Sequence, residues 1–189
     1  PRLRRIVRQI AQELEKEVEL ELVNANDELD RNVLERMLAP LEHMLRNAVD
    51  HGIELPDDRA RAGKARAGRI TLLLTREGGE VVLRLSDDGK GVPLEVVRKK
   101  AIEKEFMAPN AALSDAEVLQ FIFRPGFSTA ENVTQISGRG VGMDVVFNEI
   151  KQLGGTMKIH SSEGVGTQFI VRLPFNVSAN RALMVKVGE

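Results

Sequence analysis

The sequence predicts an α/β (α+β) domain, a two-layer sandwich in which helices cover one face of a mixed β-sheet of about five strands. Residues 17–23 alternate between polar and apolar side chains, which is typical of a strand with one buried face. Two pairs of β-rich segments, 69–75 with 81–86 and 157–161 with 167–173, each flank a glycine-containing turn. Apolar residues at helical spacing occupy segments before and between these strands, so helices are expected to form the second layer.

Two amphipathic helices are predicted around the first strand. Residues 3–16 carry apolar side chains at helical spacing. Asp30 follows a polar turn and is a candidate N-cap for a helix over residues 31–51. Pro40 lies inside this second helix, where proline can produce a kink, but the apolar stripe continues across it. Gly52 is a natural end for the helix.

The middle of the chain is predicted to contain a hairpin and two short helices. Residues 53–68 are expected to form a charged loop, and residues 76–80 form the turn of the hairpin. Pro93 is expected to open a helix that ends near residue 105, because proline is common in a first helical turn. Ser114 is expected to cap a short helix that ends at Phe123.

The C-terminal part contains a long irregular segment before its helix. Residues 124–140 are rich in glycine and polar residues and show no periodicity, whereas residues 141–153 again show helical spacing. Residues 182–187 alternate once more and are expected to be the first strand of a following domain. Because the first residue is proline, we expect the chain to be a piece of a longer protein.

The composition excludes several classes of protein. The 189 residues are 42% apolar and 29% charged, as in ordinary globular domains, and the formal net charge of −1 does not favour nucleic-acid binding. The absence of cysteine excludes disulfides, cysteine nucleophiles and cysteine metal sites. No apolar run reaches the ~18 residues that span a bilayer, so we expect no membrane insertion and a cytoplasmic location.

The helix over residues 31–51 has an unusual polar face. At about 100° per residue, its apolar residues gather on one side, and His43, Asn47, Asp50 and His51 gather on the other. His, Asn and Asp are poorer helix formers than the residues of an ordinary solvated face. The amide oxygen of Asn47 suits Mg²⁺, and His43 lies one turn earlier on the same face. From this segment alone, a ligand-binding face and a merely solvated face are equally supported.

Two glycine motifs are candidate binding loops. In Asp87-x-Gly89-x-Gly91, the carboxylate can accept a hydrogen bond from an exocyclic amine, but taken alone an ordinary turn after a strand is the better interpretation. Residues 137–144 carry Gly138, Gly140 and Gly142 directly before a helix. The backbone N–H groups of such a loop favour phosphate binding over a simple connection.

A fourth segment, residues 123–129, contains two phenylalanines. It is a candidate lid anchored by Phe123 and Phe127, although both residues also fit an ordinary core position.

Taken in chain order and with their spacing, these four motifs resemble the N, G1, F and G2 boxes of the histidine-kinase, gyrase and heat-shock-chaperone superfamily of ATP-binding domains. Gly164-x-Gly166-Thr167 resembles its last glycine box. Residues 43–52, 125–129 and 137–146 resemble the CheA-type chemotaxis histidine kinases in particular. The resemblance covers essentially the whole chain. It implies a Bergerat-type ATP-binding fold, with residues 1–175 as the kinase catalytic domain and residues 176–189 as the start of an adaptor-binding regulatory domain.

The resemblance also implies which residues bind Mg·ATP. Asp87 would bind the adenine amine above Gly91, Thr167 would close the base pocket, and Asn47 would hold Mg²⁺. His43 and His51 are the candidate catalytic residues. The complete set of implied nucleotide-binding residues is Asn47, Asp50, Asp87, Gly89, Gly91, Val92, Lys100, Ser128, Gly138, Gly140, Gly142, Met143 and Thr167. Periodicity does not separate Lys100 from Lys99 as the lysine that meets phosphate.

Two features bear on the reaction. In the ATP-hydrolysing branches, a glutamate one turn before the asparagine activates water, whereas here that position is His43 and Glu42 is rotated by about 100°. We therefore expect phosphoryl transfer to a histidine, with His43 polarising the γ-phosphate or handling a proton. Relatives often carry a lysine in the lid where this chain has Ala130, so we expect weaker nucleotide retention or slower transfer.

The acceptor histidine is expected on a separate phosphotransfer domain, presented in trans. His160 lies in a predicted strand and is interpreted as a partly buried strand residue. The resemblance implies further partners: a receptor-coupling adaptor and chemoreceptors, reached through neighbouring domains, and a response regulator downstream. The alternatives are a catalytically weak nucleotide-binding regulatory module and an α/β interaction domain that binds no ATP.

Overall fold

The computed structural model describes residues 2–24, 31–127 and 142–174. The expected cap at Asp30, most of the expected lid, the expected strand 182–187 and the segment 176–189 lie outside these residues.

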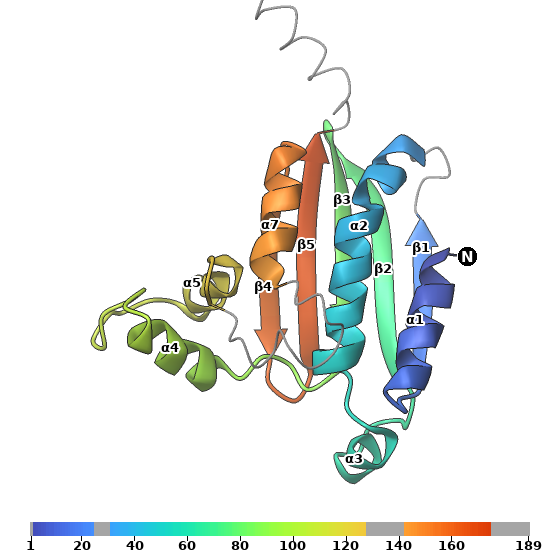
Figure 1. The fold of residues 1–189 in the computed structure, drawn as a ribbon, viewed down its shortest axis with the longest axis horizontal. Coiled ribbons are helices and arrows are strands. Elements are labelled where there is room, and N and C mark those ends of the chain that lie inside the picture. Colours follow the sequence, from blue (N-terminus) through green and yellow to red (C-terminus); the bar gives the residue numbers. More distant parts are fainter. Residues whose placement is uncertain (1, 25–30, 128–141, 175–189) are drawn as a thin grey trace, which may run out of the picture.

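A single mixed sheet of five strands forms one layer, as the sequence predicts (Figure 1). The strand order is β1-β2-β3-β5-β4; β1 and β2 are parallel, and the other neighbours are antiparallel. The strands are β1 (Val18–Asn24), β2 (Gly68–Glu77), β3 (Glu80–Asp87), β4 (Thr156–Ser162) and β5 (Gly166–Pro174).

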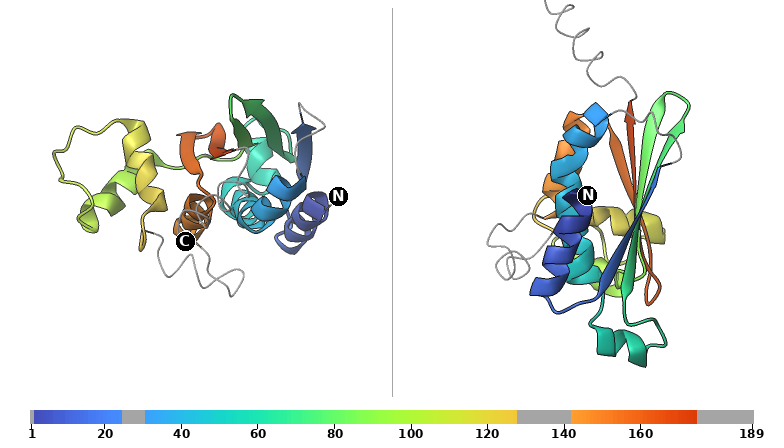
Figure 2. Two further views of the ribbon diagram at one scale, coloured as in Figure 1. Left: turned by 90° about the horizontal axis from the view of Figure 1, so that it is seen from above. Right: turned by 90° about the vertical axis from the view of Figure 1, so that its right-hand side faces the viewer.

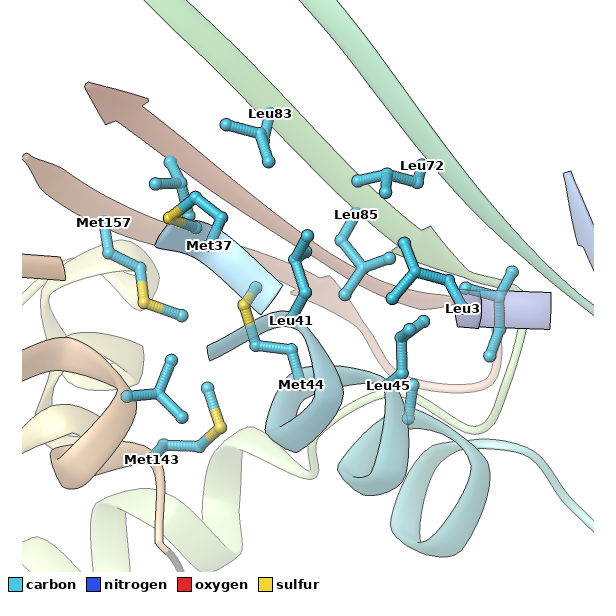
Figure 3. Packing of buried hydrophobic residues seen from close by; sticks show 14 of the residues in the cluster. Leu3, Met37, Leu41, Met44, Leu45, Leu72, Leu83, Leu85, Met143 and Met157 are labelled. Atoms are coloured by element: carbon cyan, nitrogen blue, oxygen red, sulfur yellow. The ribbon is translucent and has the colours of Figure 1, made fainter. Parts of the chain in front are cut away.

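The helices α1 (Arg2–Glu13), α2 (Arg31–Asn47) and α7 (Met143–Gln152) cover one face of this sheet (Figures 1 and 2). Leu41 and Leu45 of α2 are fully buried and lie over Leu72 and Leu85 of the central strands, as Figure 3 shows. The opposite face of the sheet carries cross-strand ion pairs, such as that between Arg84 and Glu77 (2.9 Å). The main core therefore lies on one side of the sheet, which explains the alternation in β1. β3 departs from this pattern, because Val81, Val82 and Leu83 are all buried.

A smaller hydrophobic cluster lies beside the sheet. It joins α4 (Leu94–Glu103), α5 (Asp115–Leu119) and the 3₁₀ turn η2 (Gln120–Phe123). Ser114 caps α5 with a full capping box, as predicted: its hydroxyl accepts from the amide of Glu117, and the carboxylate of Glu117 accepts from the amide of Ser114. Phe127 belongs to this smaller cluster, whereas Phe123 belongs to the main core.

The end of α2 differs from the prediction of one regular helix to residue 51. The α-helix continues through Pro40 but ends at Asn47, and a π-helical turn, η1 (Ala48–Gly52), follows. In this turn the amide of Ile53 donates to the carbonyl of Ala48 (2.8 Å). The Nζ of Lys16 donates to the carbonyls of Val49 and Asp50 (both 2.7 Å), so a distant lysine satisfies these groups.

The prediction of an uninterrupted loop over residues 53–68 is wrong. This segment contains the short helix α3 (Pro56–Arg61). Pro56 occupies the first turn, and Asp57 and Asp58 follow it, which is a favourable helix start. No helix in the described part of the chain combines the length and apolarity that a membrane span requires.

Candidate functional site

The sequence motifs meet at one end of the sheet. α2 and β3 both end there, the turn between β4 and β5 lies there, and α7 begins there (Figure 1). Four segments that are far apart in the sequence therefore contribute side chains to one region.

The Asp87 turn lies against the end of η1. The Oδ1 of Asp87 accepts a hydrogen bond from the amide of Gly89 (2.9 Å), and the amide of Lys90 donates to the carbonyl of Gly52 (2.9 Å). A side-chain carbon on Gly89 would overlap the carbonyl oxygen of Gly52, so only glycine permits this approach.

The carboxyl group of Asp87 is an unusual acid. Burial raises its pKa from 3.8 to about 6, although hydrogen bonds from the backbone of Gly89 and Thr167 act in the opposite direction. The nearby charges of Asp88 and Glu54 act in the same direction as burial and contribute to this value. A partly desolvated carboxylate at a sheet end is a strong acceptor for a ligand N–H group.

A hydrogen-bonded group on β4 and β5 lies next to the Asp87 turn. Thr167, which is buried, lies directly opposite Asp87 in the β3–β5 pair, and its hydroxyl is 3.0 Å from the Oγ of Ser161. The same Ser161 Oγ accepts from the amide of Val92 (2.8 Å). Gly91 has a φ of +75°, and a side chain there would overlap the carbonyl of Ser162. Asp87, Gly89, Gly91, Val92 and Thr167 are thus brought together.

Asn47 and Met143 are also brought together, across the α2–α7 contact. The Nδ2 of Asn47 donates to the Sδ of Met143 (3.1 Å), and Met143 turns its side chain toward the core (Figure 3). Gly142 is the N-cap of α7 and, having no side chain, makes no side-chain cap hydrogen bond to the first amides of this helix. The positive end of α7 therefore lies beside the amide of Asn47.

His43 and Glu42 point to different neighbours. The Nδ1 of His43 is 3.5 Å from the Oε1 of Glu149 on α7, and neither atom makes a hydrogen bond within the described residues, although both atoms are buried. Glu42 instead pairs with Arg2 of α1 (3.1 Å). Of these two neighbouring side chains, Glu42 therefore contacts α1 and His43 faces α7.

The remaining predicted residues are placed as follows. His51 is half-exposed, and its Nε2 is 3.4 Å from the Oδ2 of Asp50. The Nζ of Lys100 lies 5.3 Å from the ring centroid of Phe127, a cation–π contact. Ser128, Gly138 and Gly140 lie outside the described residues, as does Ala130. His160 is exposed on β4, so its interpretation as a partly buried residue is wrong: Met157 and Ile159 take the buried positions of that strand.

Sequence reasoning missed three kinds of residue. Ser161 is the last residue of the predicted strand 157–161, next to the last glycine box, and that position was its only sequence signal. Glu149 lies on the half-exposed side of an amphipathic helix, where acidic residues are ordinary. Arg59 and Lys64, which hold the Asp87 turn, belong to the segment that was predicted as a charged loop.

The described residues contain no cluster of three or more His, Asp or Glu that suits a metal. Mg²⁺ usually has few protein ligands and takes its remaining oxygens from phosphate and water. The amide oxygen of Asn47 fits that role, since the nitrogen of the same amide is engaged by Met143. The chemistry of the site therefore suits a ligand with a hydrogen-bonding base and phosphates that carry a cation.

Comparison with known proteins gives a consistent result. The model of the family "Histidine kinase-, DNA gyrase B-, and HSP90-like ATPase" matches residues 38–177. Over 98% of its length, the chain is 42% identical to a chemotaxis protein CheA of Treponema pallidum, and over its whole length 45% identical to that of Rhizobium meliloti. It spans only 23% and 25% of these two proteins, about a quarter of their length.

A solved structure shows the same fold. The blue-light activated histidine kinase EL346 of Erythrobacter litoralis is 14% identical with a TM-score of 0.52, over 90% of this chain and 40% of that one.

Proposed function

This chain belongs to the family of histidine kinase-, DNA gyrase B- and HSP90-like ATPases, and we propose that it is the ATP-binding catalytic domain of a chemotaxis-type histidine kinase. In this proposal it transfers the γ-phosphoryl group of Mg·ATP to a histidine on a separate phosphotransfer domain. The similarity to the CheA proteins over nearly the whole chain supports the type of kinase.

One observation carries the nucleotide part of the proposal. The partly buried Asp87 and the Asn47–Met143 contact, which come from three motifs far apart in the sequence, lie at one end of the sheet. α2 and β3 both end at this end of the sheet, and α7 begins there, so the sheet holds the proposed base-binding and phosphate-binding residues close together. If the glycine segment before α7 were only a flexible connection, there would be no reason for these motifs to meet.

The roles of the residues follow from their positions. Asp87 accepts a hydrogen bond from the exocyclic amine of adenine, and Thr167 and Gly91 line the base pocket with Gly89 and Val92. On the phosphate side, Gly142 and Met143 bring the first amides of α7 to the phosphates. Asn47 holds Mg²⁺, which neutralises phosphate charge when bound. Lys100, Ser128, Gly138 and Gly140 complete the phosphate contacts, and Asp50 with His51 closes the end of α2.

The orientation of two α2 side chains supports transfer rather than hydrolysis. Hydrolysis needs a carboxylate beside the γ-phosphate to activate water, but Glu42 is directed to Arg2 of α1. The position one turn before Asn47 is His43, which faces α7. An imidazole there can donate a hydrogen bond to the γ-phosphoryl oxygens in the transition state. Transfer then depends on alignment with the incoming histidine and on charge neutralisation.

The acceptor belongs to another domain in this proposal. The chain has three histidines; His43 and His51 lie at the site, and the exposed His160 is on β4. The partners are therefore a phosphotransfer domain in trans and a response regulator downstream. A receptor-coupling adaptor and chemoreceptors would be reached through neighbouring domains, of which residues 176–189 would begin the first.

Two experiments test the proposal. Titration calorimetry should detect binding of Mg·ATP, and an α/β interaction domain would give no heat of binding. Labelled ATP with the separate phosphotransfer domain should then give phosphohistidine on that domain and none on this chain. Binding without transfer would identify the regulatory module instead, and a labelled band on this chain would refute the assignment of the acceptor.

A further inference from the structure

A cluster of charged side chains lies beside the Asp87 turn and is separate from the residues assigned above. It consists of Glu54, Arg59, Lys64 and Asp88, and is called the turn clamp below. Two cations and two anions make it electrically balanced.

Arg59 is the only charged residue among the described ones that is fully buried, with 1% of its side chain exposed. Its Nη1 donates to the Oε1 of Glu54 (2.8 Å) and to the carbonyl of Asp88 (3.1 Å). Its Nη2 donates to the Oδ2 of Asp88 (3.0 Å), and its Nε to the carbonyl of Ala65 (2.6 Å). All three nitrogens of the guanidinium therefore donate hydrogen bonds.

Lys64 makes a second connection to the same turn. Its Nζ donates to the Oε2 of Glu54 (2.7 Å), the carbonyl of Asp88 (3.0 Å) and the carbonyl of Gly89 (2.8 Å). All three donors of the ammonium group are therefore used. Burial alone raises the pKa of Glu54, but the hydrogen bond from Lys64 and the charges of Lys64 and Arg59 outweigh it and lower that pKa.

These contacts fix the two peptide groups that follow Asp88. The carbonyl of Asp88 accepts from both cations, and that of Gly89 accepts from Lys64. The amide of Gly89 lies between these two carbonyls and donates to the Oδ1 of Asp87. Holding the carbonyls consequently fixes the amide that orients the Asp87 carboxylate.

The position of the turn clamp argues that stability is not its main role. α3, which carries Arg59, lies beyond the end of the sheet and outside the helical layer (Figure 1), and none of its residues belongs to the two described hydrophobic clusters. A buried ion pair is rarely more stabilising than apolar residues of the same volume, because desolvation offsets the Coulomb energy. Its hydrogen bonds, however, impose one geometry on the Asp87 turn.

We infer that the turn clamp is a positioning device for base recognition, in which Lys64 and Arg59 hold the Asp87 turn in its nucleotide-binding shape. This inference rests on the proposed function for the identity of the ligand. The turn clamp acts through Asp87 and touches no phosphate. Loss of the turn clamp should therefore weaken the binding of adenosine and the binding of ATP by the same factor.

The test uses Lys64→Met, which keeps the side-chain length and removes the donors. We expect the dissociation constants of adenosine and of Mg·ATP to rise together by about tenfold, as for the loss of a hydrogen bond from a charged donor. The matched control is Arg66→Met, because Arg66 is exposed and pairs with Asp57 on the surface (2.8 Å). Lys64→Arg retains donors and charge and should restore most of the affinity.

Hydrogen exchange provides a readout without nucleotide. In Lys64→Met the amide of Gly89 should exchange at least tenfold faster, while that of Leu83 in the central strand should be unchanged. If Lys64→Met does not fold, Glu54→Gln, which removes the charge that both cations share, takes its place with the same expectations.

If the Gly89 amide exchanges at an unchanged rate in Lys64→Met, the positioning role of the turn clamp is refuted, whether or not ATP binds. Unchanged affinity per folded molecule, or a loss confined to ATP, also refutes it. Absence of nucleotide binding by the unmodified chain would instead refute the proposed function.

Discussion

Replacement of Asp87 by asparagine should stabilise the nucleotide-free domain while removing base recognition. The pKa of this carboxyl group is about 6 in the fold and 3.8 ordinarily. Below pH 3.8 the group is protonated in both the folded and the unfolded chain and has no effect. Between the two values the folded chain binds more protons, so stability falls as the pH rises; above pH 6 the full cost of the ionised group is present.

The shift of roughly two pKa units corresponds to a cost of about 3 kcal/mol above pH 6, since one unit is worth about 1.36 kcal/mol. Asparagine has the same shape, carries no charge and still offers an acceptor to the amide of Gly89. The free energy of unfolding of Asp87→Asn should therefore exceed that of the unmodified chain by up to about 3 kcal/mol at pH 8.

Urea unfolding at pH 4.5, 6 and 8 measures this difference. It should be small at pH 4.5 and largest at pH 8. Asp57→Asn is the control, because the side chain of Asp57 is 72% exposed and its charge costs the fold nothing by burial. A variant that is no more stable than the unmodified chain at pH 8, or a gain that does not depend on pH, would refute the reasoning from burial.

Three further predictions concern ligand binding and catalysis. At pH 5, about a tenth of Asp87 is ionised, so adenosine should bind about tenfold more weakly than at pH 8, as measured by calorimetry; equal affinities would contradict the role of the carboxylate. Gly89→Ala should destabilise the fold by about 2 kcal/mol or more through its overlap with Gly52 and weaken adenosine binding, whereas Gly79→Ala, with open space around it, should change stability by less than about 0.5 kcal/mol in thermal unfolding. His43→Gln should keep nucleotide affinity and slow transfer to the phosphotransfer domain by about 10²-fold or more, and a near-normal rate would remove the assignment.

The sequence predicted the sheet well because strands such as β1 have one buried and one solvated face. Leu20 is buried and lies between the exposed Glu19 and Glu21, so alternation is visible without any tertiary information. The capping box at Ser114 is equally local. The π-helical turn after Asn47 was not predictable, because the cation that satisfies it, Lys16, is more than thirty residues away.

The same distinction applies to the site. Asp87 and Asn47 were identified because their motifs have a characteristic order, and the structure brings each next to other motif residues. Arg59 had no such signal: a buried arginine and a solvated one look the same within a charged segment. Its burial depends on two carboxylates, Glu54 and Asp88, of which the second is 29 residues away in the chain.

The two sides of the site differ in how complete they are before a ligand arrives. On the base side, Asp87, Ser161 and Thr167 are already joined to their neighbours by hydrogen bonds, so binding of adenine requires little rearrangement. On the phosphate side, the buried Nδ1 of His43 and Oε1 of Glu149 face each other without a hydrogen bond within the described residues. Unsatisfied buried groups are costly, and a small approach of α7 to α2 would shorten the distance between these two atoms. Phosphate bound at the start of α7 can draw that helix toward α2. Adenosine should therefore leave the α2–α7 contact as it is, whereas ATP should tighten it, so that the base provides affinity and the phosphates set the catalytic geometry.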